Sequence, residues 1–262
     1  MSNRLLGLAD SVEACVFDLD GVLTDSGLVH AAAWGTVLDD FLAHLTGETG
    51  RHFVTFDREL DYRRCFEGRS RTDGVHAFLE SAGIRIPEGR AGDDAAAATI
   101  HGLAARKGEV VARLLERRGV TARPGARRYL EAAGRAGLGR VVLSASANTL
   151  AMLEVAGLAS LVESCVDAGL IQREAARTPP FPDLLLAACK GLDVEPASAV
   201  AFTGRPAGVA AGLAAGMQVV GVGDGRDAEV LRGFGAELVV PSLAALLDRA
   251  VLEPSPMEGV AR

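Results

Sequence analysis

Two acidic side chains close together offer the clearest chemistry in this sequence. Asp18 and Asp20 follow the apolar run 14–17 and come directly before Gly21. A short apolar run of this kind predicts a buried parallel strand, and ligands bind at the carboxyl ends of such strands. One carboxylate could then attack a phosphorus atom while the other transfers a proton, as in covalent phosphoryl transfer. The alternative is an ordinary strand-end turn built from two acids and a glycine.

Short apolar runs and helical segments alternate over most of the chain. Strands are expected at 14–17, 140–143, 161–166, 199–202, 218–222 and 237–240. Helices are expected between them, at 126–136, 149–156, 182–191, 206–215 and 228–234. This alternation predicts an α/β fold, a doubly wound, Rossmann-like parallel sheet.

The interval 28–116 interrupts the alternation, because it contains helical segments and no convincing strand. Helices are expected at 30–45, 73–82 and 99–118, and a loop at 83–94. We expect this interval to form an inserted α-helical cap domain over the sheet. Residues 1–27 and 117–252 would form the α/β core domain, joined to the cap by linkers near 26–28 and 117–124. Residues 253–262 are expected to form a flexible C-terminal tail.

Composition narrows the class of protein. The 262 residues carry a formal net charge of −7 without a dense basic run, which argues against a nucleic-acid partner. No apolar stretch approaches the roughly 18 residues of a membrane span, so no membrane association is expected. The four cysteines form no CxxC pair and are typical of buried thiols in a reducing compartment. These features predict a cytoplasmic protein, which we take to be a monomer.

Segment 18–26, reading DLDGVLTDS, resembles the first motif of the haloacid-dehalogenase superfamily. The helical insert after the first strand resembles the β-phosphoglucomutase-like branch of that superfamily. Other parts of the chain match in the same order: His30 and Trp34 of the helix leading into the cap, the substrate-recognition turn 66–73, the second motif at 143–148, and the region of the fourth motif at 203–217. The resemblance extends over about 14–240 and implies the fold described above.

The resemblance also implies roles for individual residues. Asp18 would be the nucleophile that becomes phosphorylated, and Asp20 the general acid and base. Mg²⁺ would be bound by the Asp18 carboxylate and the Asp20 backbone carbonyl. The substrate and its phosphate would contact Ser144, Ala145, Ser146, Asn148, Arg71 and His30. Alternatives stay open for these contacts: helix capping for the polar residues of 144–148, a solvent-exposed position for Arg71, and a capping or core position for His30.

The third motif departs from the pattern of the branch, which reads Lys-Pro-x-Pro-Asp. Pro179 occupies the lysine position before the matching stretch 180–183. Of the 27 basic residues only Lys107 and Lys190 are lysines, and neither adjoins this stretch. Arg177 is the nearest cation, and it would reach the site only if the loop folds back.

The fourth motif departs as well. The branch supplies two carboxylates to Mg²⁺ here, whereas this chain has Thr203 and Gly204, followed by Arg205. If Arg205 points inward, it could supply positive charge where the metal would sit. A phosphate near the two aspartates is otherwise repelled by roughly 4 kcal/mol per charge pair at about 4 Å. The lost carboxylates therefore leave Mg²⁺ binding, and normal turnover, open.

Two functions compete on these grounds. The first is an aspartyl-phosphate phosphotransferase or hydrolase acting on a small phosphorylated metabolite, most simply a sugar phosphate. Glu67 replaces a lysine that the mutases of the branch carry, which favours hydrolysis or a changed substrate. The second is a non-catalytic protein of the same fold that binds a phosphorylated ligand or a protein partner. Carbon–halogen hydrolysis is disfavoured, because that chemistry does not need Asp20.

Overall fold

The computed structural model describes residues 3–252, so the predicted tail at 253–262 lies outside the described residues. Within this range six parallel strands form one sheet in the order β3-β2-β1-β4-β5-β6. The strands are β1 (Ala14–Asp18), β2 (Gly139–Leu143), β3 (Ser164–Val166), β4 (Ala199–Thr203), β5 (Gln218–Val222) and β6 (Leu238–Val240). This order confirms the predicted doubly wound sheet. The strand order reverses between β1 and β4, where open α/β sheets bind their ligands.

Strand β1 shows why both faces of the sheet need helices. All five of its residues are buried, and the four apolar ones before Asp18 alternate between two apolar clusters. Cys15 and Phe17 belong to one cluster, and Phe17 stacks on Phe202 of β4 with ring centroids 4.7 Å apart. Ala14 and Val16 belong to the other cluster. A parallel strand flanked in this way is apolar throughout, which explains why β1 was visible in the sequence.

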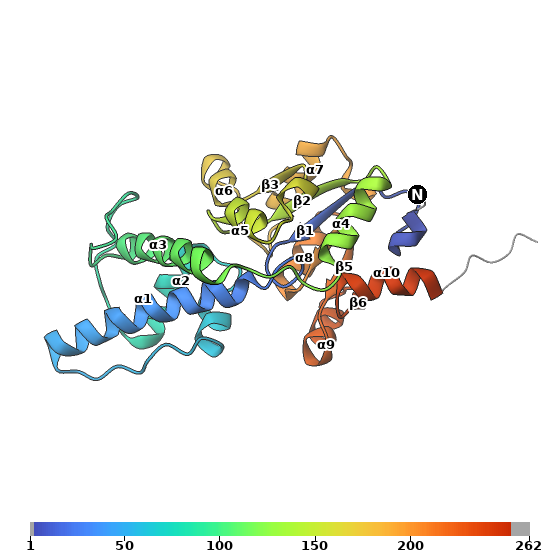
Figure 1. Cartoon of the computed structure of the whole chain (residues 1–262). Coiled ribbons are helices and arrows are strands. Elements are labelled where there is room, and N and C mark those ends of the chain that lie inside the picture. Colours follow the sequence, from blue (N-terminus) through green and yellow to red (C-terminus); the bar gives the residue numbers. More distant parts are fainter. Residues whose placement is uncertain (1–2, 253–262) are drawn as a thin grey trace, which may run out of the picture.

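Helices on both faces supply these clusters. The cluster around Phe17 contains residues of α4 (Ala126–Arg135), α5 (Thr149–Val155) and α10 (Leu243–Leu252). The opposite cluster contains residues of α7 (Asp183–Leu192), α8 (Pro206–Ala214) and α9 (Gly225–Gly233), with α6 (Ala168–Glu174) packed against it. Figure 1 shows the sheet enclosed by these helices.

The register brings three strand ends to one edge of the sheet. Asp18 of β1 pairs with Leu143 of β2, so Ser144 follows directly beyond it. Phe17 pairs with Phe202 of β4, which places Thr203 level with Asp18. This edge faces the helices inserted after β1.

The inserted region forms a helical unit beside the sheet (Figure 1). It contains α1 (Ser26–Thr49), a π-helical turn (Tyr62–Phe66), α2 (Arg71–Ala82) and α3 (Ile100–Arg118). The predicted linker at 26–28 is wrong, because α1 begins at Ser26. The two chain crossings lie just outside these helices and bond to each other: Asp25 N–H donates to the Thr121 carbonyl and Arg123 N–H to the Leu23 carbonyl. The helices extend slightly beyond the predicted cap, 28–116, and its limits stay a proposal.

Aromatic rings form the centre of this cap. Trp34 of α1 packs on Phe66 at 4.3 Å between ring centroids, and Phe56 meets Phe78 of α2 at 5.5 Å. Gly74 of α2 makes this packing possible, because a Cβ there would lie 2.3 Å from the Phe66 ring. Phe66 thereby brings the π-helical turn and the start of α2 close together.

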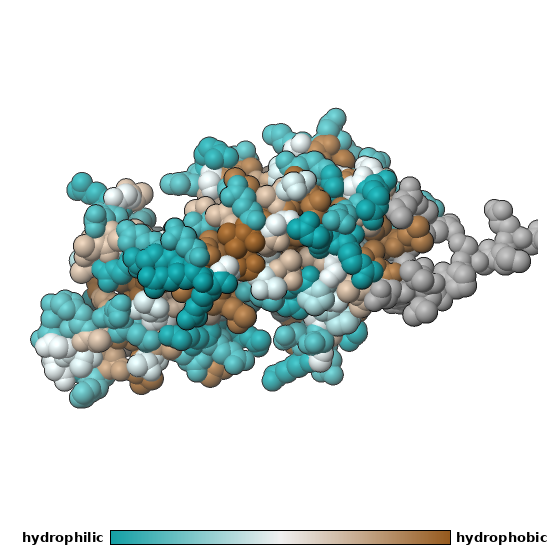
Figure 2. Space-filling model, in the orientation of Figure 1, coloured by the Kyte–Doolittle hydropathy of each residue, from teal (hydrophilic) through white to brown (hydrophobic). Residues whose placement is uncertain are grey.

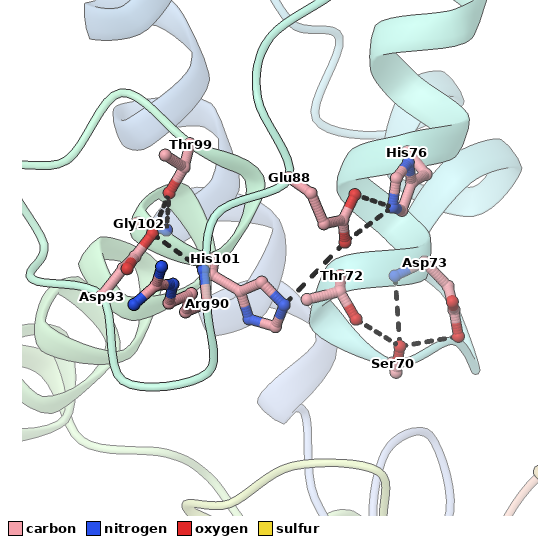
Figure 3. A network of polar contacts seen from close by, with 10 residues as sticks. All are labelled: Ser70, Thr72, Asp73, His76, Glu88, Arg90, Asp93, Thr99, His101 and Gly102. Atoms are coloured by element: carbon pink, nitrogen blue, oxygen red, sulfur yellow. Dashed lines mark hydrogen bonds and ion pairs between the residues drawn. The ribbon is translucent and has the colours of Figure 1, made fainter.

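Polar contacts fasten the predicted loop 83–94 to the cap helices (Figure 3). The Glu88 carboxylate lies 3.0 Å from Nε2 of His76 on α2 and 3.9 Å from Nε2 of His101 on α3. Thr99 caps α3 by accepting the Gly102 N–H at 2.9 Å, and its hydroxyl donates to Asp93 at 2.7 Å. The loop therefore has a defined path although it contains no helix or strand.

The hydropathy of the surface and the burial of the cysteines agree with what the composition predicts. On the visible face, hydrophilic residues dominate over the cap helices, and apolar residues gather where the cap meets the core and beside α10 (Figure 2). No helix within residues 3–252 is both long and apolar enough to cross a membrane. All four cysteines are free, and only Cys165 is not fully buried.

Candidate active site

A cavity of about 50 Å³ lies between the cap and the carboxyl edge of the sheet. This is room for a few water molecules only. The residues that line it from the core are Asp20, Leu143, Ser144, Ala145, Ser146 and Arg205. Those from the cap are His30, Trp34, Tyr62, Phe66, Gly68, Arg69, Ser70, Arg71 and Lys107. Most of the predicted site residues therefore meet in one place.

Asp18 is not among the residues that line this cavity, and it contacts Thr203, the last residue of β4, and Arg205 just beyond the strand. Its Oδ2 accepts a hydrogen bond from the Thr203 hydroxyl at 2.6 Å. The same oxygen accepts from Arg205 Nε at 3.2 Å and lies 3.1 Å from Arg205 Nη2. The Asp18 charge raises the pKa of Arg205 above its usual value, so this guanidinium is always charged. Arg205 does point inward.

Asp20 is held by the end of the first motif. The Ser26 hydroxyl donates to Asp20 Oδ1, and the Thr24 hydroxyl lies 2.6 Å from Ser26 Oγ. Thr24 and Ser26 are fully buried, whereas Asp20 is half-buried and lines the cavity. The short polar stretch after Gly21 thus orients the carboxylate that would transfer protons.

Lys107 is a site residue that the sequence did not indicate. Its Nζ lies 2.8 Å from Nδ1 of His30 and 5.8 Å from the centre of the Trp34 ring. Burial, and then the charge of Arg71, lower the pKa of Lys107 to about 7. Burial also lowers the pKa of His30 well below its usual value, so His30 is neutral and can accept a hydrogen bond.

One signal could have revealed Lys107. On α3 it lies four residues from Leu103 and four from Val111, both completely buried. Residues at this spacing share a helix face, so a lysine between them must also point into the protein.

Arg71 reaches the cavity because of where α2 begins. Ser70 caps the helix by accepting the Asp73 N–H at 3.1 Å, and Arg71 is the first helical residue. Arg71 is half-buried and lines the cavity, beside Lys107. The solvent-exposed alternative for Arg71 is therefore not what the structure shows.

In the turn after β2, two serine hydroxyls accept backbone N–H groups, and the same serines line the cavity. Ser144 Oγ accepts the Ser146 N–H at 3.2 Å, and Ser146 Oγ accepts the Asn148 N–H at 3.1 Å. Each hydroxyl can still donate its own proton to a ligand. Asn148 lies outside the cavity lining, but its Nδ2 is buried with no hydrogen-bond partner among the residues described.

The third-motif region supplies no cation to this cavity. Arg177 pairs with Asp183, with Nε 3.0 Å and Nη2 2.9 Å from the carboxylate, and stacks on the exposed Phe181 ring at 4.1 Å. It does not fold back toward Asp18. The positive charges that line the cavity come instead from Arg69, Arg71, Lys107 and Arg205.

Comparison with known proteins agrees with this geometry. The family model for haloacid dehalogenase-like hydrolases matches residues 12–216. A protein named beta-phosphoglucomutase from Mycobacterium tuberculosis (strain CDC 1551 / Oshkosh) is 43% identical over 249 residues, which cover 94% of this chain and 95% of that protein. The chain therefore belongs to the haloacid dehalogenase-like hydrolase family, and it is an enzyme of the phosphatase and mutase type.

Solved structures show the same fold. The beta-phosphoglucomutase from Clostridium difficile matches with a TM-score of 0.71 at 24% identity, over 92% of this chain and all of that chain (100%). A HAD family hydrolase from Deinococcus radiodurans R1, solved with bound phosphate and sodium, matches with a TM-score of 0.59 at 31% identity, over 93% and 98% of the two chains.

Enzymes of this family generally use Mg²⁺, but the donors in this chain fit a divalent cation poorly. Within residues 3–252 no group of three or more His, Cys, Asp or Glu side chains could hold a metal ion. A Cβ at Gly204 would lie 3.2 Å from the Val222 carbonyl, so an acidic side chain there would be crowded. A divalent ion about 4 Å from the Arg205 guanidinium would be repelled by roughly 8 kcal/mol at an effective dielectric constant near 20.

Proposed function

We propose that this enzyme is an aspartate-based phosphotransferase of the β-phosphoglucomutase type, acting on a sugar phosphate. The observation that carries this proposal is the meeting of the Asp18–Asp20 edge with cationic cap residues around one cavity. The mycobacterial relative named beta-phosphoglucomutase, similar over nearly the whole of both chains, supports the same substrate class.

The chemistry would proceed in two halves. First, an Asp18 carboxylate oxygen attacks phosphorus, the bond from phosphorus to the sugar oxygen breaks, and Asp20 gives its proton to the departing oxygen. Then an acceptor hydroxyl attacks the phosphorylated Asp18, Asp20 takes the acceptor's proton, and the Asp18 carboxylate is released. A sugar hydroxyl as acceptor gives a mutase, and water gives a phosphatase.

The surrounding residues suit the binding of a phosphorylated sugar. Ser144, Ala145 and Ser146 would contact the phosphate at Asp18, while Arg71 and Lys107 would contact it from the cap. The unpartnered Nδ2 of Asn148 supports a further ligand contact. Because the cavity between cap and sheet holds only a few water molecules, we expect the cap to move away from the sheet when the substrate enters.

Several sequence expectations remain proposals. Mg²⁺ binding by Asp18 and the Asp20 carbonyl stays a prediction, and we assign no step to the metal because its donors fit poorly. A monomeric state, the absence of nucleic-acid partners and a cytoplasmic location also stay proposals. The four free cysteines support a reducing compartment.

The direct experiment measures turnover in the purified full-length protein and in Asp18→Asn. We expect the wild type to isomerise β-glucose 1-phosphate or to release phosphate from a member of a sugar-phosphate panel. Asp18→Asn should lose at least about 10³-fold in kcat, because the nucleophile is removed. Turnover that is absent with and without Mg²⁺, or that survives in Asp18→Asn, would rule out the proposal.

The non-catalytic alternative keeps one specific observation in its favour. Asp18 is paired with Arg205, and no lysine stands before Pro180 to balance the phosphate. A phosphorylated ligand that raises the Tm of the protein without ever phosphorylating Asp18 would favour this alternative.

A further inference from the structure

We propose that Arg205 takes the place of the divalent cation at Asp18, so that a phosphate group binds beside Asp18 without a metal ion. This inference rests on the proposed function, because it concerns the same nucleophile and the same phosphate. The reasons are geometric, electrostatic and compositional.

Among residues 3–252, the side-chain hydrogen bonds and the ion pair of Asp18 fall on one of its two oxygens. Oδ2 receives the Thr203 hydroxyl at 2.6 Å, Arg205 Nε at 3.2 Å and Arg205 Nη2 at 3.1 Å. A cation fixed on one carboxylate oxygen leaves the other, Oδ1, to attack phosphorus. Thr203 also accepts the Arg205 backbone N–H at 3.2 Å, which fixes the start of the arginine relative to Asp18.

The guanidinium has donors left for a phosphate. Arginine carries five N–H groups, and the two nitrogens that meet Asp18 do not use them all. Arg205 Nη1 points toward Gly68 in the turn 66–73 of the cap. A Cβ added to Gly68 would lie only 2.7 Å from this nitrogen. Arg205 also lines the cavity between cap and sheet, so its free donors reach the space where the substrate phosphate would lie. Arginine commonly binds phosphate through two parallel hydrogen bonds.

The end of β4 supplies a positive charge of its own, on which the charges of Asp18, Asp20 and Glu67 all act. In the pattern of the branch, two carboxylates at this place are matched by the two positive charges of Mg²⁺. Here Thr203 and Gly204 are neutral, and Arg205 adds one positive charge. The Arg205 side chain is 19% exposed and that of Asp18 is 5% exposed, so their attraction is weakly screened by water. The residues at 203, 204 and 205, which differ from the pattern of the branch, thus act together in place of the metal and its two carboxylates.

Calorimetric titration with inorganic phosphate tests this inference separately from turnover. We expect the wild type to bind phosphate in EDTA within about twofold of its affinity in Mg²⁺. Arg205→Gln should weaken binding in EDTA by about 10- to 100-fold, since it removes charged hydrogen bonds. Arg205→Lys, which keeps the charge, should retain part of the affinity. Added guanidinium chloride should restore binding to Arg205→Ala.

The matched control is Arg177→Gln, which removes an arginine that contacts Asp183 through the same two nitrogens but lies outside the cavity. Its phosphate affinity should equal that of the wild type. Circular dichroism spectra of the Arg205 variants establish that they fold. If Arg205→Gln does not fold, Arg205→Lys replaces it in the phosphate titration.

Two results would overturn the inference: phosphate binding by the wild type that requires Mg²⁺, or binding in EDTA that Arg205→Gln leaves unchanged. Sugar-phosphate turnover that depends entirely on Mg²⁺ would also count against it, while leaving the proposed function intact. Phosphate binding in EDTA that depends on Arg205, without turnover under any condition, would support the inference and reject the proposed function.

Discussion

Burial lowers the pKa of both central cations of the site, but the neighbouring charges shift the two pKa values in opposite directions. Arg205 lies against the Asp18 carboxylate, whose charge raises the arginine pKa. Lys107 is more deeply buried than Arg205 and has the neutral His30 as its contact, and burial together with Arg71 lowers its pKa to about 7. A buried charge is stable only where an opposite charge compensates its lost hydration. The guanidinium of Arg205 stays charged in any case, and the Asp18 charge raises its pKa further, whereas the lysine amine of Lys107, without such a partner, loses its proton much more easily.

Lys107 makes a prediction about stability and pH. Its native pKa of about 7 lies below that of an unfolded lysine, so between about pH 7 and pH 10 the unfolded state binds more protons. The buried charge of Lys107 therefore lowers the free energy of unfolding by its full amount below pH 7. This destabilisation disappears as the pH rises toward 10. We expect the free energy of unfolding of Lys107→Met, minus that of the wild type, to decrease by a few kcal/mol from pH 7 to pH 10.

Urea unfolding at several pH values measures this difference. The control is Lys190→Met, because Lys190 is exposed on α7 and its replacement should give a difference that does not change with pH. A pH-independent difference for Lys107→Met would contradict the assignment of a buried, readily deprotonated lysine.

At the scale of elements, helix α8 sets the position of the Thr203 hydroxyl. A Cβ at Gly208 would lie 2.1 Å from Thr203 Oγ1, so the helix can pack over the end of β4 only with glycine there. Thr203 in turn donates to Asp18. A helix on one face of the sheet thus influences the position of Asp18, the proposed nucleophile, through a single hydroxyl.

Gly208→Ala should therefore affect both stability and the site. We expect a loss of about 1–3 kcal/mol in the free energy of unfolding from overpacking. We also expect a fall in phosphate affinity, because the displaced Thr203 would no longer hold Asp18 Oδ2. Thermal unfolding and phosphate titration measure the two effects.

Gly191→Ala on α7 is the matched control. A Cβ at Gly191 would meet no atom within 4 Å, so alanine there should stabilise the protein by about 0.5–1 kcal/mol without changing phosphate binding. Unchanged phosphate affinity in Gly208→Ala would show that α8 does not position Thr203.

At the scale of the whole molecule, cap and core form one apolar unit that nevertheless must open. A single buried cluster includes Trp34 and Phe66 of the cap, Leu23 of the crossing segment and Phe17 of the sheet. The small cavity lies at the same junction. Admission of a sugar phosphate therefore requires movement about the two chain crossings.

Trp34 reports on this movement, because it is the only tryptophan in the chain and lines the cavity. Opening exposes its ring to water, and a bound ligand should favour the closed state, in which the ring is 3% exposed. We expect β-glucose 1-phosphate to reduce quenching of Trp34 fluorescence by acrylamide. Asp18→Asn is the form to use, since the ligand should persist without turnover. Quenching that does not respond to saturating ligand would argue against cap opening.

Most of the fold could be predicted from local patterns. The apolar runs at 14–17, 140–143, 199–202 and 218–222 became strands within one residue of their predicted limits. The run 161–166 was the least regular, and its strand is shorter, Ser164–Val166, because a 3₁₀ turn takes up Ala159–Leu161. A strand buried on both faces must be apolar throughout, and this property is visible without any knowledge of its neighbours.

The sequence by itself determined which pair of carboxylates we propose as catalytic, because Asp18, Asp20 and Gly21 lie within one short segment. Only the tertiary structure decided which cations face that pair. Arg205 lies 187 positions from Asp18, and Lys107 lies 77 positions from His30. Their approach depends on the β1–β4 register and on the packing of α3 against α1, and a side chain's direction follows from such packing rather than from its neighbours in sequence.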